Sequence, residues 1–141
     1  MLKKKKVLAY ITNQNKLLVF NQPNHPEAGI QVPGGTVEKD EDIHKAIIRE
    51  VNEETGLSSF SIISYLGQVE RDMRDYGKNE VHQRHFFHIT TEENQNRSWQ
   101  HIEKFCSEGN EDILFNFYWI NISNAKDLIL SHGELIHLIE R

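Results

Sequence analysis

The sequence predicts a single domain of the α/β class, in which several strands accompany one long helix. A chain of 141 residues with 38% hydrophobic residues has enough apolar mass for one core. Several short segments are rich in β-branched and aromatic residues, which favours strands. Residues 41–55 instead carry apolar side chains at helical spacing, and Gly56 follows in the position that commonly ends a helix.

Turn-forming residues separate the expected strands. The turn Thr12-Asn13-Gln14-Asn15 divides the first strand from the second, and residues 21–29 hold two of the three prolines and form a loop. Segment 112–121 is apolar on both faces, which is typical of a strand inside a sheet. The expected strands are 6–12, 16–20, 30–32, 36–37, 61–73, 81–90 and 112–121.

The remaining segments are expected to be helix or loop. Asp40 or a neighbour should cap the helix over residues 41–55, because a short acidic side chain can accept from the free N–H groups of the first turn. A short C-terminal helix is expected within residues 128–139. Residues 92–110 are polar and are expected to form a loop or an irregular hairpin, and long loops in small domains often serve function.

Composition and charge exclude several classes of protein. The formal net charge is −5, whereas proteins that coat DNA or RNA are basic, so no stable nucleic-acid complex is expected. The Lys3–Lys6 run is expected to be a solvated, fraying terminus. No apolar run approaches the ~20 residues of a membrane span, and no signal-peptide core follows the lysines. We therefore expect no membrane partner. The single Cys106 excludes an intrachain disulfide, which suits a reducing compartment, so we expect a cytoplasmic protein.

The expected helix places acidic residues on the face that should meet the core. At about 100° per residue, Ile43 and Ile47 define an apolar stripe that Ala46 and Val51 extend. The same arithmetic places three glutamates along this stripe or at its edge. They are Glu50, Glu53 and Glu54.

A bound cation would explain this placement. Burial of ionised carboxylates is unfavourable unless their charge is neutralised. Two simpler interpretations are that the last helical turns leave the core, or that Arg49 pairs with Glu53, but neither accounts for a tight cluster on the core-facing side. A hard divalent cation with oxygen ligands does account for the cluster. The Pro33-Gly34-Gly35 turn ahead of the helix supports this interpretation, because glycine lets backbone approach a ligand closely.

The segment from Gly35 to Leu57 resembles the Nudix box. It follows the order G-x5-E-x7-R-E-U-x-E-E-x-G-U, where U is a bulky aliphatic residue, and every fixed position is filled. Pro33-Gly34 also stands in its usual place ahead of the motif. The resemblance implies a Nudix-type α/β/α sandwich around a mixed β-sheet, with residues 1–141 as one domain. The matching residues are Gly35, Glu41, Arg49, Glu50, Val51, Glu53, Glu54, Gly56 and Leu57.

The resemblance also implies an activity. It is hydrolysis, dependent on Mg²⁺ or Mn²⁺, of a phosphoanhydride bond in a nucleoside diphosphate derivative such as a nucleoside triphosphate or a dinucleoside polyphosphate. A non-catalytic Nudix-like module that binds a nucleotide is one alternative, and a structural protein with solvated glutamates is another. Carried over by position, Glu50, Glu53 and Glu54 would be metal ligands together with the Gly35 carbonyl, and Arg49 would orient a box glutamate.

The general base is expected outside the box, as is often so in this family. Carboxylates that hold a metal are poor bases, and the polar segment 92–112 supplies other candidates, which are Glu103, Glu108, Glu111 and Asp112. Glu108 and Glu111 flank Gly109-Asn110, a pair suited to a turn that could aim either carboxylate inward. Either one is therefore predicted to be the base, with Glu53 or Glu103 as the next choice.

Four further residues are predicted to bind the substrate. Arg71, Arg74 and Tyr76 lie in an expected turn within residues 70–79, and Arg84 lies in the expected strand 81–90. The arginines would contact phosphate and Tyr76 would stack on a base, although an exposed turn tyrosine is the simpler alternative. The predicted partner is thus a small nucleotide, and a homodimer is left open.

Overall fold

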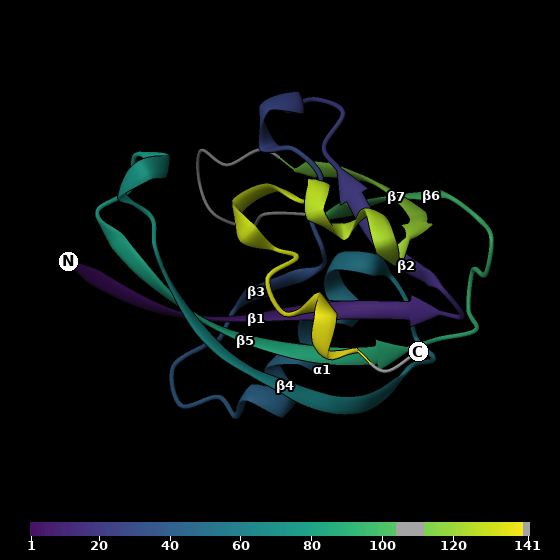
Figure 1. Ribbon diagram of the computed structural model, residues 1–141, viewed down its shortest axis with the longest axis horizontal. Helices are drawn as coiled ribbons and strands as arrows, with labels where there is room; N and C mark the ends of the chain where they lie inside the picture. Colours follow the sequence, from purple (N-terminus) through teal and green to yellow (C-terminus); the bar gives the residue numbers. More distant parts are fainter. Residues whose placement is uncertain (104–111, 140–141) are drawn as a thin grey trace.

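A seven-stranded mixed β-sheet organises the chain (Figure 1). The computed structural model describes residues 1–103 and 112–139. The strand order is β4-β5-β1-β2-β7-β6, with β3 paired to β1 outside this path. β1 and β5 are parallel, whereas the other pairs are antiparallel, so the expected mixed sheet is confirmed. The strands are β1 (Leu2–Asn13), β2 (Lys16–Asn21), β3 (Gly34–Thr36), β4 (Ser61–Asp72), β5 (Glu80–Thr90), β6 (Trp99–Glu103) and β7 (Ile113–Asn121).

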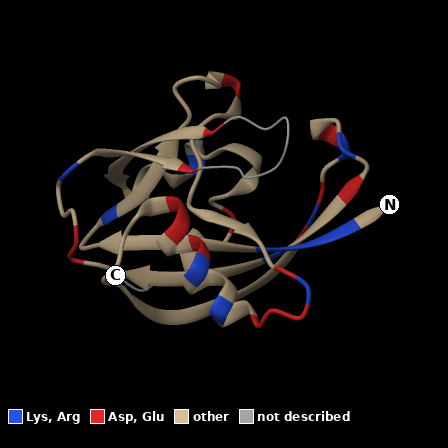
Figure 2. Cartoon of the chain, turned by 180° about the vertical axis from the view of Figure 1, so that it is seen from behind, with Lys and Arg blue, Asp and Glu red and all other residues tan. Residues whose placement is uncertain are grey.

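The N-terminal lysine run is part of β1, so the prediction of a fraying terminus is wrong. Lys3 to Lys6 pair in register with Val81 to Arg84 of β5, which supplies the backbone partners that a free terminus would lack. Because side chains alternate along a strand, Lys3 and Lys5 remain exposed while the neighbouring lysines are half-buried. The run is the blue stretch of β1 next to the N-terminus in Figure 2.

The helix α1 (Ile43–Thr55) begins two residues later than predicted. Its N-cap is Asp42, whose carboxylate accepts from the N–H groups of His44 and Lys45 at 3.0 and 3.2 Å. Asp40 has a left-handed backbone with φ of 63° and lies in the preceding turn. Gly56 ends the helix with φ of 79°, a conformation that costs glycine little.

The predicted C-terminal helix is instead a series of short 3-10 turns, η3 (Ile122–Asp127), η4 (Ile129–Ser131) and η5 (Ile136–Leu138). Leu130 and Ser131 both have positive φ, and two such residues in succession interrupt a right-handed helix. The second helical layer of the expected sandwich is therefore made of 3-10 turns. Two further turns are η1 (Pro26–Ala28) and η2 (Arg74–Tyr76). No helix in residues 1–103 and 112–139 is long and apolar enough to cross a membrane.

The sheet separates two apolar clusters. On one face, Val7 and Ala9 of β1 pack with Ile47 and Val51 of α1. On the other face, residues of opposite parity such as Tyr10 pack against the C-terminal turns. This alternation follows from the period of two along a strand buried on both sides. Figure 1 shows the sheet between α1 and the C-terminal segment.

The edge strand β6 fixes the C-terminal end of α1. Trp99 stacks on Phe117 of β7 with ring centroids 5.2 Å apart, and its Nε1 donates to the Thr55 carbonyl at 2.8 Å. The His101 ring donates to the Glu53 carbonyl at 2.7 Å. β7 lies between β2 and β6, which confirms the prediction of an interior strand. These contacts bring the end of β6 against the acidic face of α1.

Candidate active site

The glycine turn of β3 lies directly against the acidic face of α1. The Gly34 N–H donates to Oε1 of Glu54 at 3.1 Å. A Cβ added at Gly35 would lie 2.2 Å from Oε2 of Glu50, and one at Gly34 would lie 2.3 Å from the Val7 carbonyl oxygen. No side chain fits at either position without displacing these groups. The two glycines therefore let the backbone reach the carboxylates.

Arg49 holds the acidic residues of the box in one network. Its guanidinium makes two hydrogen bonds of 2.8 Å to Glu41 and one of 2.8 Å to Glu50. It also donates to Glu53 at 3.3 Å and to the Thr36 carbonyl at 3.1 Å. The Arg49 bonds to Glu41, and then a hydrogen bond from the Glu38 N–H, lower the pKa of Glu41 to about 2, so Glu41 is an ionised anchor for Arg49. The pairing of Arg49 with Glu53 is thus one contact of a larger network.

Three carboxylates converge at the end of this network. Glu50, Glu53 and Glu103 offer oxygens that all lie within 4.8 Å of one another. Glu103 comes from β6, and the sequence suggested it only as an alternative base. Glu54 lies outside this group among the described residues and is instead part of a cavity wall.

Burial raises the pKa of Glu50, Glu54 and Glu103, most strongly that of Glu54. Glu50 and Glu54 are only 8% and 7% exposed, and each carboxylate in the group also raises the pKa of a neighbour by like-charge repulsion. Such groups are stabilised by a proton or by a cation. The donors are all oxygen atoms, which suits a hard divalent cation rather than zinc or copper. The residues present therefore fit the divalent metal that the sequence predicts.

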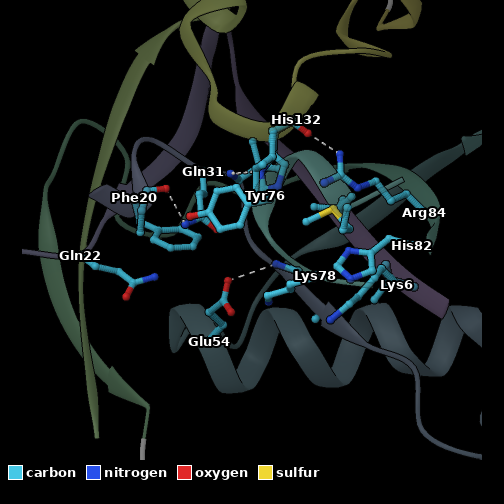
Figure 3. A pocket seen from close by; sticks show the side chains of 18 residues that line it. Lys6, Phe20, Gln22, Gln31, Glu54, Tyr76, Lys78, His82, Arg84 and His132 are labelled. Atoms are coloured by element: carbon cyan, nitrogen blue, oxygen red, sulfur yellow. Dashed lines mark hydrogen bonds between the residues drawn. The ribbon is translucent and has the colours of Figure 1, made fainter. Parts of the chain in front are cut away.

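A cavity of about 300 Å³ opens beside the glycine turn and Glu54. Glu54, Gly34 and Gly35 line it where it meets β3 and α1, and Arg84 and His132 line its far end (Figure 3). Its volume is at the lower end of the range typical of small-molecule sites. The residues labelled in the figure are Lys6, Phe20, Gln22, Gln31, Glu54, Tyr76, Lys78, His82, Arg84 and His132.

The predicted substrate-binding residues separate into two pairs. Tyr76 and Arg84 line the cavity. Arg71 and Arg74 are not among its lining residues, and they pair instead with Asp75 at 2.8 Å and Asp72 at 2.6 Å. The predicted bases Glu108 and Glu111 lie outside the described residues.

Several lining residues are not among the four that the sequence predicted to bind the substrate. Lys6 comes from β1, Lys78 from the turn after η2, His82 from β5 and His132 from the C-terminal segment. No local motif joins these positions. The one property that they share is a cationic side chain or a hydrogen-bond donor, and many surface residues have that property too.

Comparison with known proteins identifies the family. The NUDIX domain model matches residues 2–138, nearly the whole chain. The chain belongs to the NUDIX family. The Nudix resemblance of the box is thereby confirmed, and the expectation of a Nudix hydrolase is confirmed at the level of the family.

Individual relatives of this NUDIX domain carry different names. An ADP-ribose pyrophosphatase of Methanocaldococcus jannaschii is 36% identical over 69 residues, which cover 47% of this chain and 41% of that protein. The match thus spans less than half of that relative.

Two solved structures share the fold. A MutT NUDIX hydrolase from Burkholderia pseudomallei has a TM-score of 0.63 at 18% identity, covering 99% of this chain and 100% of that one. The dihydroneopterin triphosphate pyrophosphohydrolase of E. coli has a TM-score of 0.63 at 17% identity, covering 99% and 97%. At these identities the structures confirm the predicted fold but do not identify the substrate.

Proposed function

We propose that this NUDIX domain hydrolyses a phosphoanhydride bond in a nucleoside diphosphate derivative, with Mg²⁺ or Mn²⁺ as cofactor. One observation carries the proposal: Glu54, a buried acidic residue of the box, lines a cavity of ligand size together with Gly34 and Gly35. A nucleotide in the cavity would therefore have its phosphates beside the carboxylates. A nucleoside triphosphate or a dinucleoside polyphosphate is the substrate class that we favour.

The metal would be held by oxygen ligands of the box. Glu50, Glu53 and Glu54 would supply carboxylates, Gly35 its carbonyl, and Glu103 a further carboxylate from β6. When bound, a divalent cation neutralises phosphate charge and lowers the pKa of water. The glycine turn has the close approach to Glu50 that such a shared site requires.

The chain's own residues would orient and activate the reactants. Arg49 fixes Glu50 and Glu53 through charge-assisted hydrogen bonds, so their oxygens are preorganised before substrate binds. Glu108 or Glu111 would accept the proton of the attacking water as it adds to phosphorus. Arg84 would bind phosphate, and Tyr76, which is 42% exposed, can place its ring against a nucleobase.

The proposed partner is a small nucleotide, with no stable DNA or RNA complex. A chain of net charge −5 with a cavity of about 300 Å³ favours a small ligand over a nucleic-acid strand. We place the protein in the cytoplasm, since the single cysteine fits a reducing compartment. Monomer and homodimer are both compatible with the proposed reaction.

A nucleotide panel tests the proposal. Purified protein is incubated with ADP-ribose, nucleoside triphosphates and dinucleoside polyphosphates, with millimolar Mg²⁺ or with chelator, and the products are separated by ion-exchange chromatography. We expect cleavage of at least one phosphoanhydride that chelator abolishes and Mg²⁺ restores. Arg97→Gln, an exposed change outside the cavity lining, is the matched control and should retain this activity.

The non-catalytic alternative predicts a different result. A binding module would retain nucleotide in equilibrium dialysis but leave it intact in Mg²⁺ and in Mn²⁺. Binding without cleavage across the whole panel would favour that alternative over hydrolysis.

A further inference from the structure

The far end of the cavity contains a buried arginine without a counter-ion. Arg84 is 2% exposed and lines the cavity. Its Nη1 donates to the Leu130 carbonyl at 2.5 Å, and no carboxylate lies within ion-pair distance of it among residues 1–103 and 112–139. Burial, helped by Arg71, lowers the pKa of Arg84 to about 10. A buried cation of this kind is stabilised when an anion joins it.

Neighbouring strands add further donors on the same side of the sheet. Lys6 is directly opposite Arg84 in the β1–β5 pairing, and Arg71 is opposite His82 in the β4–β5 pairing. Residues 82 and 84 face the same side because side chains alternate along a strand. Arg71 Nε is buried and is the side-chain atom left without a hydrogen-bond partner among the described residues. Cationic side chains of three strands therefore lie on this side of the sheet. Arg71 is paired with Asp75 at 2.8 Å and Lys6 is attracted by Glu80 and Glu50, which leaves Arg84 as the buried cation without an ion-pair partner among the described residues.

His132 contributes a donor that carries no charge. Its Nδ1 accepts from the Val32 N–H at 3.2 Å, so in the neutral ring the proton resides on Nε2. Burial, and then Arg84 and Arg71, lowers the pKa of His132 to about 3, so the ring is neutral at physiological pH. His132 and Arg84 lie beside each other at one end of the cavity in Figure 3.

Among residues 1–103 and 112–139, no carboxylate forms an ion pair with Arg84 or Lys78, whereas Asp75 pairs with Arg71. Glu54, the acidic residue of the cavity lining, lies at the opposite end and is bonded to Gly34. Glu134 attracts Arg84 electrostatically, but it is exposed and its charge is screened by solvent. Lys78, which is exposed, is a further cation of the cavity lining. The cavity is thus polarised, with the Glu54 carboxylate at one end and Arg84 and His132 at the other.

We propose that Arg84, His132 and Lys78 form a distal anion subsite for a phosphate monoester at the non-reacting end of the substrate. This inference rests on the proposed function, since it assumes that the phosphoanhydride lies at the Glu54 end. A phosphate offers acceptors in several directions, which matches donors that arrive from β5, from the turn after η2 and from the C-terminal segment. The preferred substrate is therefore a phosphoanhydride that carries an additional phosphate monoester.

Binding of inorganic phosphate tests the subsite without any turnover. Calorimetric titration in chelator, so that no metal can bind the anion, should show binding that weakens with added salt. Arg84→Gln should lower the affinity at least about tenfold, the size expected for loss of a charge-assisted contact. Arg97→Gln removes an exposed arginine outside the cavity and should bind as the wild type does.

A second variant tests the subsite in case Arg84→Gln does not fold. Lys78 is exposed, so Lys78→Gln should leave the fold intact while lowering phosphate affinity a few-fold and reducing its salt dependence. Absence of phosphate binding to the wild type, or equal affinity in the wild type, Arg84→Gln and Lys78→Gln, would overturn the subsite. A neutral occupant of this end, such as a nucleobase edge, would give that result.

Turnover of matched substrates then distinguishes free phosphate from a phosphate of the substrate. One nucleotide is compared with and without a phosphate monoester at its non-reacting end. We expect the phosphorylated form to have at least about tenfold higher kcat/KM in the wild type, and Arg84→Gln to remove that preference. Equal kcat/KM in the wild type would overturn the assignment to substrate. A complete lack of turnover would refute the proposed hydrolysis, and phosphate titration would still decide whether the subsite exists.

Discussion

Glu54 is the residue at which the acidic face of α1 meets the cavity. It is buried, accepts from the Gly34 N–H and has a raised pKa. Glu54→Gln retains the shape but removes charge beside the proposed metal, so we predict a loss of kcat of about 10²-fold or more with the fold retained. Steady-state kinetics and circular dichroism measure both quantities. Lys45→Gln, an exposed change on the same helix, should be nearly silent, and equal activity of the two variants would contradict the assigned role.

His132 should make stability depend on pH. Its pKa is about 3 in the folded state because of burial and about 6.5 when unfolded, so between these values the unfolded state binds the proton more tightly. The contribution of His132 to the free energy of unfolding is fully present above about pH 6.5 and is lost as the pH falls toward 3. We predict a loss of about 2 kcal/mol between pH 7.5 and pH 5 from this residue.

Urea unfolding in phosphate-free buffer measures this contribution. His82, His85 and His88 also have lowered pKa values because of burial, so the quantity to compare is the difference between wild type and His132→Gln. The variant should have the shallower pH dependence. Parallel profiles for the two proteins would show that His132 does not titrate as predicted.

Among the elements, α1 was predictable from sequence because its signals are local. The apolar period, the acidic N-cap and the glycine stop all lie within a few residues of one another. Its start was placed slightly too early because Asp40 and Asp42 are both plausible caps, and only the left-handed backbone of Asp40 separates them.

For residues 92–110 the sequence indicated only a loop or an irregular hairpin, and the strand β6 lies within that range. Residues 99–103 are partly polar, and their placement depends on Trp99 stacking on Phe117 and bonding to Thr55. Those partners are distant in sequence, so no local pattern reports them. Glu103 joins Glu50 and Glu53 only because of this docking.

The segment after β6 contains the predicted general bases. We predict that either Glu108→Gln or Glu111→Gln lowers kcat by about 10²–10⁴-fold and leaves Mg²⁺ affinity nearly intact, because a base contributes to the rate and not to metal binding. The loss should diminish at high pH, where hydroxide needs no base. Stopped-assay kinetics with Mg²⁺ titration measure both effects.

Glu103→Gln is the comparison for this prediction. Because Glu103 lies within the carboxylate cluster, its variant should weaken Mg²⁺ binding as well as slow the reaction. If both single variants and the double variant at positions 108 and 111 turn over at the wild-type rate, neither residue is the base. Glu53 or Glu103 would then be assigned that role.

The whole molecule should be stabilised by its metal. A ligand that binds only the folded state adds about 2.7 kcal/mol at a concentration of 100 times Kd, which corresponds to a rise in Tm of several degrees for a domain of this size. We predict that Tm rises when millimolar Mg²⁺ replaces chelator, as measured by calorimetry. Lys45→Gln should show the full rise, whereas Glu50→Gln should show a smaller one. Equal Tm values for the wild type in both conditions would count against a metal site of useful affinity.

By itself the sequence determined the class of fold, the helix and the acidic box, because periodicity, capping and motif spacing are local properties of the chain. Tertiary structure decided which distant residues accompany the box. The parallel pairing of β1 with β5 places Lys6 beside Arg84, and the C-terminal turns bring His132 to the same cavity. Those contacts depend on strand order and on packing between segments more than 40 residues apart in the sequence, and a pattern of neighbouring residues carries no record of them.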